Sequence, residues 1–165
     1  MDCLLFRHGI ACDREDWRGN DHDRPLTDKG MLRTRQSSKG VVTLGLVPTH
    51  ILSSPLARAQ ETAKIVKSVL PSTPPLRICH ELNPEVAPRA LISLLNTLPS
   101  DAIVLCVGHE PHLSAVAGIL LTGKPCTGLS LKKAGACLLH FEGSVRPARG
   151  RLEWWLTASQ LRALA

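Results

Sequence analysis

Four side chains of the kind that handle anionic groups stand just beyond short apolar runs of the sequence. Arg7 and His8 come directly after one such run. His109 follows a second run, and Arg58 stands a few residues beyond a third. The arginine guanidinium is a permanently charged, planar fork of donors that matches the oxygens of a phosphate. Histidine serves as nucleophile, as base or as a structural residue, so Arg7 and His8 alone are equally compatible with an ordinary surface pair.

The runs that precede these residues have the character of buried strands. Residues 4–6 are continuously apolar, as strands of parallel sheets often are. Residues 50–54 run from apolar residues into two serines, and residues 102–107 form the clearest buried strand. Open α/β sheets bind their ligands at the carboxyl ends of the strands. We therefore expect the two arginines and the two histidines to converge at one edge of a sheet.

Arg58 is informative because of its place on the helix that follows the second strand. We predict that Ser54 caps this helix and that Pro55 is its first residue, which puts Arg58 in the first turn. The N-terminus of a helix carries a partial positive charge and disfavours a nearby cation by up to about 1 kcal/mol. A bound anion between Arg58 and the helix would remove that penalty. The plain alternative is that Arg58 extends into solvent.

The rest of the chain alternates signals for helices and strands. Helices are expected at 27–44 with Thr27 as cap, 55–70, 88–98 and 111–121, strands at 76–79, 135–141 and 152–156, and a last short helix after Thr157. Residues 10–24 are polar and aperiodic and predict a long loop, which in a compact domain is usually functional or mobile. The basic segment 144–151 predicts a solvated loop. The alternation predicts one α/β domain over residues 1–165, a three-layer α/β/α sandwich with a mostly parallel central sheet.

The bulk composition excludes several classes of protein. The chain has 165 residues, of which 44% are hydrophobic and 21% charged, as in globular proteins with a real core. Its net charge of +6 favours anionic ligands, but nucleic acid is not expected, because aromatic residues make up only 3% and tyrosine is absent. There is no apolar run of membrane-spanning length and no signal-peptide pattern. These features predict a cytoplasmic protein without a membrane partner.

The cysteines and the remaining histidines do not predict a metal site. Of the six cysteines, Cys3, Cys79 and Cys106 lie in or beside strand-like runs, as buried free thiols do, and no Cys-x-x-Cys pair occurs. His112 is three residues from His109, but the helix is expected to begin between them and no third ligand is spaced with them. We expect no metal and no cofactor.

Two imidazoles and two guanidinium groups around a dianion are suited to phosphoryl transfer. A neutral imidazole attacks phosphorus in line to form a phosphohistidine, which water then hydrolyses. Fixed cations stabilise the charge that spreads over the equatorial oxygens. The Gly-x-x-x-x-Gly-Lys loop of nucleoside triphosphatases is absent.

The ordered set of motifs resembles the histidine phosphatase superfamily, and within it the small SixA-type phosphohistidine phosphatases. The motifs are Arg7-His8-Gly9 after a strand, Arg58 after a Ser-Pro helix start, Gly108-His109 after a later strand, the segments 24–27, 81–84 and 152–156, Gly30 and Leu161. The resemblance covers essentially the whole chain. The Arg-His-Gly triplet is unspecific alone, whereas the ordered set is specific.

The resemblance implies a role for each matched residue. His8 would be the nucleophile, and Arg7, Arg58 and His109 would form the phosphate pocket. Arg24 is similar to an arginine of the SixA-like branch that also reaches phosphate. The implied fold is that of the phosphoglycerate mutases, and the implied activity is metal-independent hydrolysis of phosphohistidine carried by a partner protein.

The identity of a general acid stays open at this point. In some branches of the superfamily a carboxylate follows the second histidine, where this chain has Glu110, and in others it comes from a mid-chain loop, where Glu81 stands. SixA-like proteins do without a strong acid, because the imidazole that leaves a phosphoramidate is readily protonated. Glu110 at a helix start and Glu81 in a loop are equally compatible with ordinary structural charges.

Two alternative functions are compatible with the same residues. One is hydrolysis of a small phosphomonoester or sugar phosphate by the same mechanism. The other is a non-catalytic adaptor that binds phosphorylated proteins, which the intact set of His8, His109 and the two arginines disfavours.

Overall fold

A six-stranded sheet in the order β3-β2-β4-β1-β5-β6 forms the centre of the molecule in the computed structural model, which describes residues 1–165. The strands are β1 (Asp2–Arg7), β2 (His50–Ser53), β3 (Leu76–Ile78), β4 (Ile103–Gly108), β5 (Ala136–His140) and β6 (Arg151–Leu156). β1 to β4 are mutually parallel, and β5 pairs antiparallel with both β1 and β6. The expected mostly parallel sheet is confirmed.

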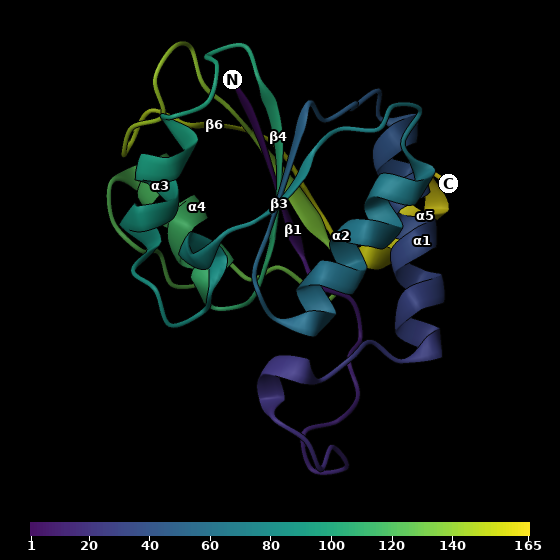
Figure 1. Ribbon diagram of the computed structural model, residues 1–165. Helices are drawn as coiled ribbons and strands as arrows, with labels where there is room; N and C mark the ends of the chain where they lie inside the picture. Colours follow the sequence, from purple (N-terminus) through teal and green to yellow (C-terminus); the bar gives the residue numbers. More distant parts are fainter.

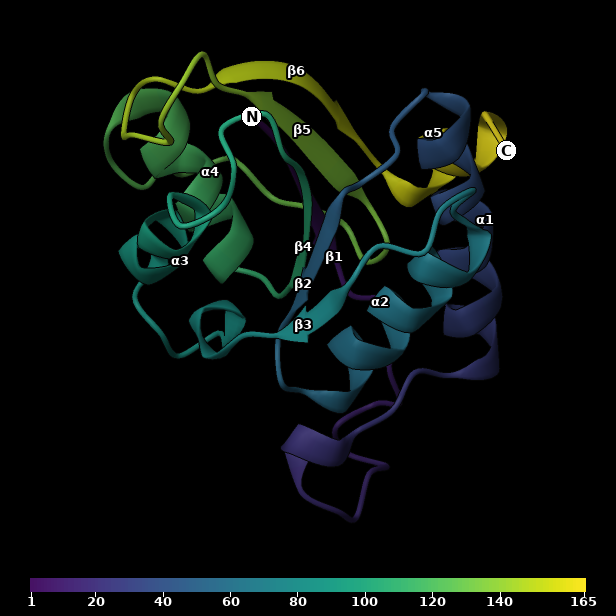
Figure 2. The ribbon, with the colours of Figure 1, turned by 45° about the horizontal axis from the view of Figure 1, so that its top comes forward.

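Helices cover both faces of this sheet (Figure 1). They are α1 (Asp28–Thr43), α2 (Ala57–Val69), α3 (Pro88–Leu95), α4 (His112–Thr122) and α5 (Ala158–Ala163), with short 3-10 turns η1 (Asp21–Asp23) and η2 (His80–Leu82). α3 and α4 lie on one face, and α1, α2 and α5 lie on the other, as the rotated view in Figure 2 also shows. The fold is therefore the predicted three-layer α/β/α sandwich. None of the helices is long and apolar enough to cross a bilayer.

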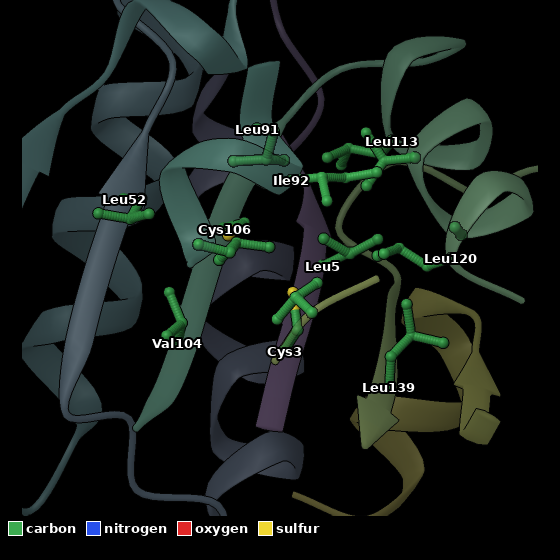
Figure 3. Close-up of a cluster of buried hydrophobic side chains, with 14 of the residues drawn as sticks. Cys3, Leu5, Leu52, Leu91, Ile92, Val104, Cys106, Leu113, Leu120 and Leu139 are labelled. Atoms are coloured by element: carbon green, nitrogen blue, oxygen red, sulfur yellow. The ribbon is translucent and has the colours of Figure 1, made fainter. Parts of the chain in front are cut away.

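The central strand β1 supplies side chains to two separate cores. Cys3 and Leu5 point into the core beneath α3 and α4 (Figure 3), whereas Leu4 and Phe6 belong to the core beneath α1, α2 and α5. All four side chains are fully buried. Because successive residues of a strand face opposite sides, a strand covered on both faces must be apolar at every position. This is why residues 4–6 have no polar alternation.

The expected helix signals at Thr27 and Thr157 are confirmed. The Thr27 side chain accepts a hydrogen bond from the Gly30 amide, and Thr157 forms a capping box with Gln160. Gly45, at φ +79°, adopts the left-handed conformation just after α1, where other residues would be strained. A side-chain cap is worth about 1 kcal/mol to a helix.

The start of α2 differs from the sequence-based expectation. The helix begins at Ala57 with Leu56 at the cap position, and no side chain caps it. Ser54 stands further upstream, where its hydroxyl accepts a long hydrogen bond from the Leu56 amide and lies 2.7 Å from His109 Nε2. The short contact of Ser54 is therefore with His109, directly after β4, and Ser54 is not the cap of α2. Arg58 nevertheless lies in the first turn, as expected.

Two further boundaries also differ. The expected helix 88–98 ends at Leu95. The side-chain Nδ2 of the next residue, Asn96, donates hydrogen bonds to the carbonyls of Ile92 and Val145. Residues 80–84, expected as a loop, contain η2. All six cysteines are free thiols, and Cys3, Cys79 and Cys106 are buried as expected.

The segment 10–24 projects from the carboxyl edge of the sheet, in purple in Figure 1. It leaves β1 through Gly9 and returns to α1 through an isolated bridge between Ala11 and Leu26. Its tip contains η1. The only long projection of the chain therefore stands beside the ends of the strands that carry the predicted site.

Candidate active site

The register of β1 and β4 brings the two histidines together. Arg7 is paired with Gly108, and the amide of His8 donates a hydrogen bond of 3.0 Å to the Gly108 carbonyl. The next residue, His109, consequently lies beside His8, with the ring centroids 5.0 Å apart. Adjacent parallel strands therefore deliver one imidazole each to the same point.

Hydrogen bonding fixes the tautomer of His8. Its Nδ1 lies 2.7 Å from the carbonyl oxygen of Gly9, which only accepts, so Nδ1 carries the proton. The lone pair is then on Nε2, the nitrogen that faces no protein partner. Burial lowers the pKa of His8 to about 3, and the positive charges of Arg58 and Arg7 act in the same direction. The side chain is thus a neutral imidazole at physiological pH, the form that attacks phosphorus.

His109 has one nitrogen satisfied and one buried without a partner. Its Nε2 lies 2.7 Å from the hydroxyl of Ser54, whereas Nδ1 is buried and makes no hydrogen bond. Burial lowers the pKa of His109 to about 2, with the neighbouring His8 and Arg58 adding to the effect. A buried polar atom without a partner costs about 1–3 kcal/mol, so a ligand that forms a hydrogen bond with Nδ1 would be favourable.

Arg58 and Arg24 share one carboxylate on the projecting segment. Arg58 donates to the Asp21 carbonyl through Nη1 and to its carboxylate through Nη2, at 2.9 and 3.2 Å. Arg24 donates to the same carboxylate through Nε at 2.8 Å. These contacts leave Arg58 Nε buried and unpaired. The two cations hold the pKa of Asp21 below its usual range, so it stays ionised.

Arg7 is held by the segment before β5. Its Nη1 donates 2.7 Å to the Leu131 carbonyl, and its Nε is buried without a partner. Glu110 fixes the same segment, because one carboxylate oxygen accepts from the Leu131 amide and the other from the Ser114 hydroxyl. Both oxygens of Glu110 are therefore engaged in structural contacts.

Two glycines allow the chain to leave β1 at this point. A Cβ on Gly9 would lie 2.2 Å from Thr34 Oγ1, and a Cβ on Gly30 would lie 2.0 Å from the Ile10 carbonyl oxygen. Only glycine fits these close approaches. The Gly9 amide donates to the Thr62 hydroxyl, which donates in turn to the Arg58 carbonyl. Thr62 thereby ties the loop of the histidine to the helix of the arginine.

These groups line one hollow of about 220 Å³. Its lining consists of Arg7, His8, Ala11, Arg24, Arg58, Pro84, His109, Glu110 and Lys133. Three of the lining side chains keep a buried nitrogen without a hydrogen-bond partner, namely Arg7 Nε, Arg58 Nε and His109 Nδ1, and the two arginine nitrogens are donors. Cations and unsatisfied donors that converge on one hollow favour a small oxyanion, which accepts several hydrogen bonds at once. No group of three metal-ligating side chains lies together anywhere in the chain.

Comparison with known proteins agrees with this geometry. Residues 3–83 match the model of the histidine phosphatase superfamily (branch 1). The chain belongs to the histidine phosphatase superfamily. An uncharacterised protein of Picosynechococcus sp. is 39% identical over 82% of both chains.

Solved structures show the same fold as this chain. The protein histidine phosphatase SixA complexed with tungstate superposes with a TM-score of 0.85 at 22% identity, over 98% of this chain and 99% of that one. Mycobacterial glucosyl-3-phosphoglycerate phosphatase with VO3 gives a TM-score of 0.73 at 16% identity, over 94% and 99%. The phosphoglycerate mutase-like fold class is thereby confirmed.

The hollow contains most of the residues expected from the sequence. Arg7, His8, Arg58 and His109 converge, and Arg24 and Glu110 line the same hollow. Glu81 is not among its lining residues, although Pro84 of the same segment is.

Sequence reasoning missed two charged members of the site. Lys133 lines the hollow and opposes protonation of His8. Asp21 neutralises Arg58 and Arg24. The signal for Lys133 was the Lys132-Lys133 pair shortly before β5, but nothing in the sequence indicated that this loop folds back onto the end of β1.

Proposed function

We propose that this protein hydrolyses phosphohistidine on a partner protein through a covalent phosphohistidine formed on His8. The observation that carries the proposal is the state of His8, which is neutral, protonated on Nδ1 and surrounded by cations. An imidazole of this kind has its Nε2 lone pair free for attack. The tungstate complex of the SixA phosphatase, which has the same fold, supports an oxyanion at this edge of the sheet.

The first step transfers the phosphoryl group to the enzyme. His8 Nε2 forms a bond to phosphorus while the bond between phosphorus and the imidazole nitrogen of the substrate breaks, and the leaving imidazole takes up a proton from solvent. In this scheme Arg7, Arg58 and Arg24, which line the hollow, bind the phosphoryl oxygens, and Lys133 adds charge. His109 Nδ1 is buried without a partner in the same hollow, and in this scheme it donates to a phosphoryl oxygen. These groups are fixed before substrate binds, so little reorganisation accompanies the transition state.

The second step regenerates the histidine. Water attacks the phosphorus of phospho-His8, the bond to Nε2 breaks, and inorganic phosphate leaves with the proton balance restored by solvent. Imidazole is a good leaving group once protonated, so this scheme needs no strong general acid. That agrees with the engagement of both Glu110 oxygens and with the position of Glu81 away from the lining.

A trapping experiment tests the proposal. Wild-type protein is mixed with a carrier protein labelled with ³²P on histidine and quenched in alkali, in which phosphohistidine survives. We expect label on His8 and release of phosphate, and a loss of turnover of about 10³-fold or more in His8→Ala. His80→Ala is the matched control, because His80 is exposed and its side chain makes no hydrogen bond. Turnover by purified His8→Ala within about tenfold of the wild-type rate would contradict the covalent mechanism.

The same assay separates the alternative functions. Turnover of p-nitrophenyl phosphate without turnover of any phosphohistidine protein would identify a small-molecule phosphatase. The assay with p-nitrophenyl phosphate is needed because a glucosyl-3-phosphoglycerate phosphatase has a related fold. Binding of the phosphoprotein without a labelled His8 would identify an adaptor.

A further inference from the structure

A second hollow, of about 380 Å³, lies next to the catalytic one. Its lining consists of Arg7, Ile10, Arg33, Lys132, Lys133, Ala134, Ala158 and Arg162. Arg7 and Lys133 line both hollows. A ligand whose phosphoryl group sits beside His8 therefore has this second hollow, which we call the basic hollow, immediately adjacent.

Positive charge gathers in the basic hollow without compensation. Arg33 comes from α1, Lys132 and Lys133 from the loop before β5, and Arg162 from α5. No aspartate or glutamate lines it. None of these four side chains takes part in an ion pair, whereas Arg14, Arg24, Arg58 and Arg151 each have a carboxylate partner. Like charges that gather from three elements without a counter-ion create a potential that attracts anions.

The backbone holds this cluster in a fixed position relative to the nucleophile. The Ala134 amide lies 3.1 Å from the carbonyls of both Arg7 and His8 and donates to them. Ala134 adopts a φ of +57°, which turns the chain sharply between the two lysines and β5. On the other side, α5 packs on α1 so closely that a Cβ on Gly40 would lie 1.9 Å from the Leu161 carbonyl oxygen.

The character of the side chains indicates what kind of anion fits. Lys132 and Lys133 are exposed, and Arg33 and Arg162 are half-buried. The basic hollow differs here from the hollow that contains His8. Its only buried donor without a partner is Arg7 Nε, and Arg7 lines both hollows. Mobile cations at the rim of an open hollow suit several carboxylates on a protein surface better than one tightly chelated ion.

We propose that the basic hollow binds acidic side chains that flank the phosphohistidine on the protein substrate. This inference rests on the proposed function and deepens it by naming a substrate feature. The phosphoryl group occupies the hollow of His8, while neighbouring aspartates or glutamates contact Arg33, Lys132, Lys133 and Arg162. Phosphohistidine proteins with an acidic surface around the modified residue are then preferred over neutral ones.

Two synthetic peptides test this preference by direct binding. Both carry a non-hydrolysable analogue of phosphohistidine, flanked in one by Asp and Glu and in the other by Asn and Gln. Isothermal titration calorimetry with the full chain is expected to show about fivefold tighter binding of the acidic peptide, as two exposed ion pairs would give. The preference is expected to shrink as NaCl is raised.

Variants locate the preference on the protein. Arg33→Gln/Arg162→Gln is expected to reduce the preference for the acidic peptide to about twofold, because Lys132 and Lys133 remain in the lining. Lys39→Gln/Lys64→Gln removes the same number of charges at exposed positions outside the basic hollow and is expected to keep the preference. Equal affinity of the wild type for the two peptides would overturn the inference, as would an undiminished preference in Arg33→Gln/Arg162→Gln.

The binding assay and the turnover assay test the two proposals independently. A preference for the acidic peptide in a wild type that hydrolyses no phosphohistidine protein would support the basic hollow and refute the proposed reaction. Hydrolysis of phosphohistidine proteins with no acidic preference would support the reaction and refute the basic hollow. Binding of neither peptide at millimolar concentration would refute both.

Discussion

The chemistry of His8 depends on one carbonyl oxygen and on its cationic surroundings. The Gly9 carbonyl holds the proton on Nδ1, which leaves the lone pair on Nε2. Burial, together with Arg58 and Arg7, keeps a second proton away and lowers the pKa to about 3. The same cations that would bind the phosphoryl oxygens thus also keep the nucleophile unprotonated.

The tautomer of His8 can be tested by ¹⁵N nuclear magnetic resonance. At pH 5, where an ordinary histidine is mostly charged, we expect His8 to show one protonated and one bare nitrogen, with the proton on Nδ1. A His8 ring with both nitrogens protonated at pH 5 would contradict the neutral nucleophile.

Glu110 is expected to act through structure rather than as an acid. Its oxygens accept from the Leu131 amide and the Ser114 hydroxyl. In Glu110→Gln the new amide can accept from the Leu131 amide and donate to the Ser114 hydroxyl, so kcat should stay within about threefold of the wild-type value. The substrate is an alkyl phosphate, because its poor leaving group would make the loss of a general acid visible. A general acid contributes about 10²–10⁴-fold, and a loss of that size in Glu110→Gln would assign it that role. Glu110→Ala should cost about 1–3 kcal/mol of stability by leaving these donors unpaired.

At the scale of elements, the packing of α5 on α1 depends on Gly40. Glycine costs a helix interior about 1 kcal/mol relative to alanine, so Gly40 weakens the sequence signal for α1. The structure gives the compensation, because a Cβ at this position would meet the Leu161 carbonyl oxygen at 1.9 Å. Close packing of two helices therefore outweighs helix propensity here.

Gly40→Ala is expected to destabilise the protein despite its better propensity. Since backbone atoms must move apart, we expect a loss of about 2 kcal/mol in the free energy of unfolding measured with urea. Lys39→Ala, an exposed neighbour on the same helix, should change it by less than about 0.5 kcal/mol. A neutral or stabilising effect of Gly40→Ala would show that α5 can move away from α1 without a loss in the free energy of unfolding.

Most of the helices and strands could be predicted from the sequence. Residues 4–6 and 102–107 are apolar throughout because both faces of their strands are buried, and Thr27 and Thr157 signal helix starts through local hydrogen bonds. Ser54 misled the prediction because it has two competing partners, a helix amide and His109, and only the tertiary structure decides between them. Asp21 and Lys133 could not be placed, since their role depends on loops folding back over a strand end.

At the scale of the whole molecule, the two histidines make stability depend on pH. The pKa values of His8 and His109 in the folded protein, about 3 and about 2, lie below the ordinary value near 6.5. The unfolded chain therefore binds more protons than the folded one below pH 6.5. Folding stability contributed by the neutral rings is complete above that pH and is lost as the pH falls toward 3.

This loss can be measured by urea unfolding at pH 7 and pH 5. Each histidine should lower the free energy of unfolding at pH 5 by about 2 kcal/mol relative to pH 7. The double variant His8→Gln/His109→Gln removes both groups, so the difference between its pH dependence and that of the wild type isolates their contribution. Identical pH dependence of the two proteins would show that the rings are not buried in the neutral form.

The position of β1 has a consequence for dynamics. This strand lies in the interior of the sheet, paired on one side with β4 and on the other with β5. Its amides are protected from exchange with solvent deuterium by two neighbours, so they open only when the sheet itself comes apart. His8 follows directly after this strand and its amide donates to the Gly108 carbonyl, so we expect the nucleophile to keep its position until the sheet unfolds.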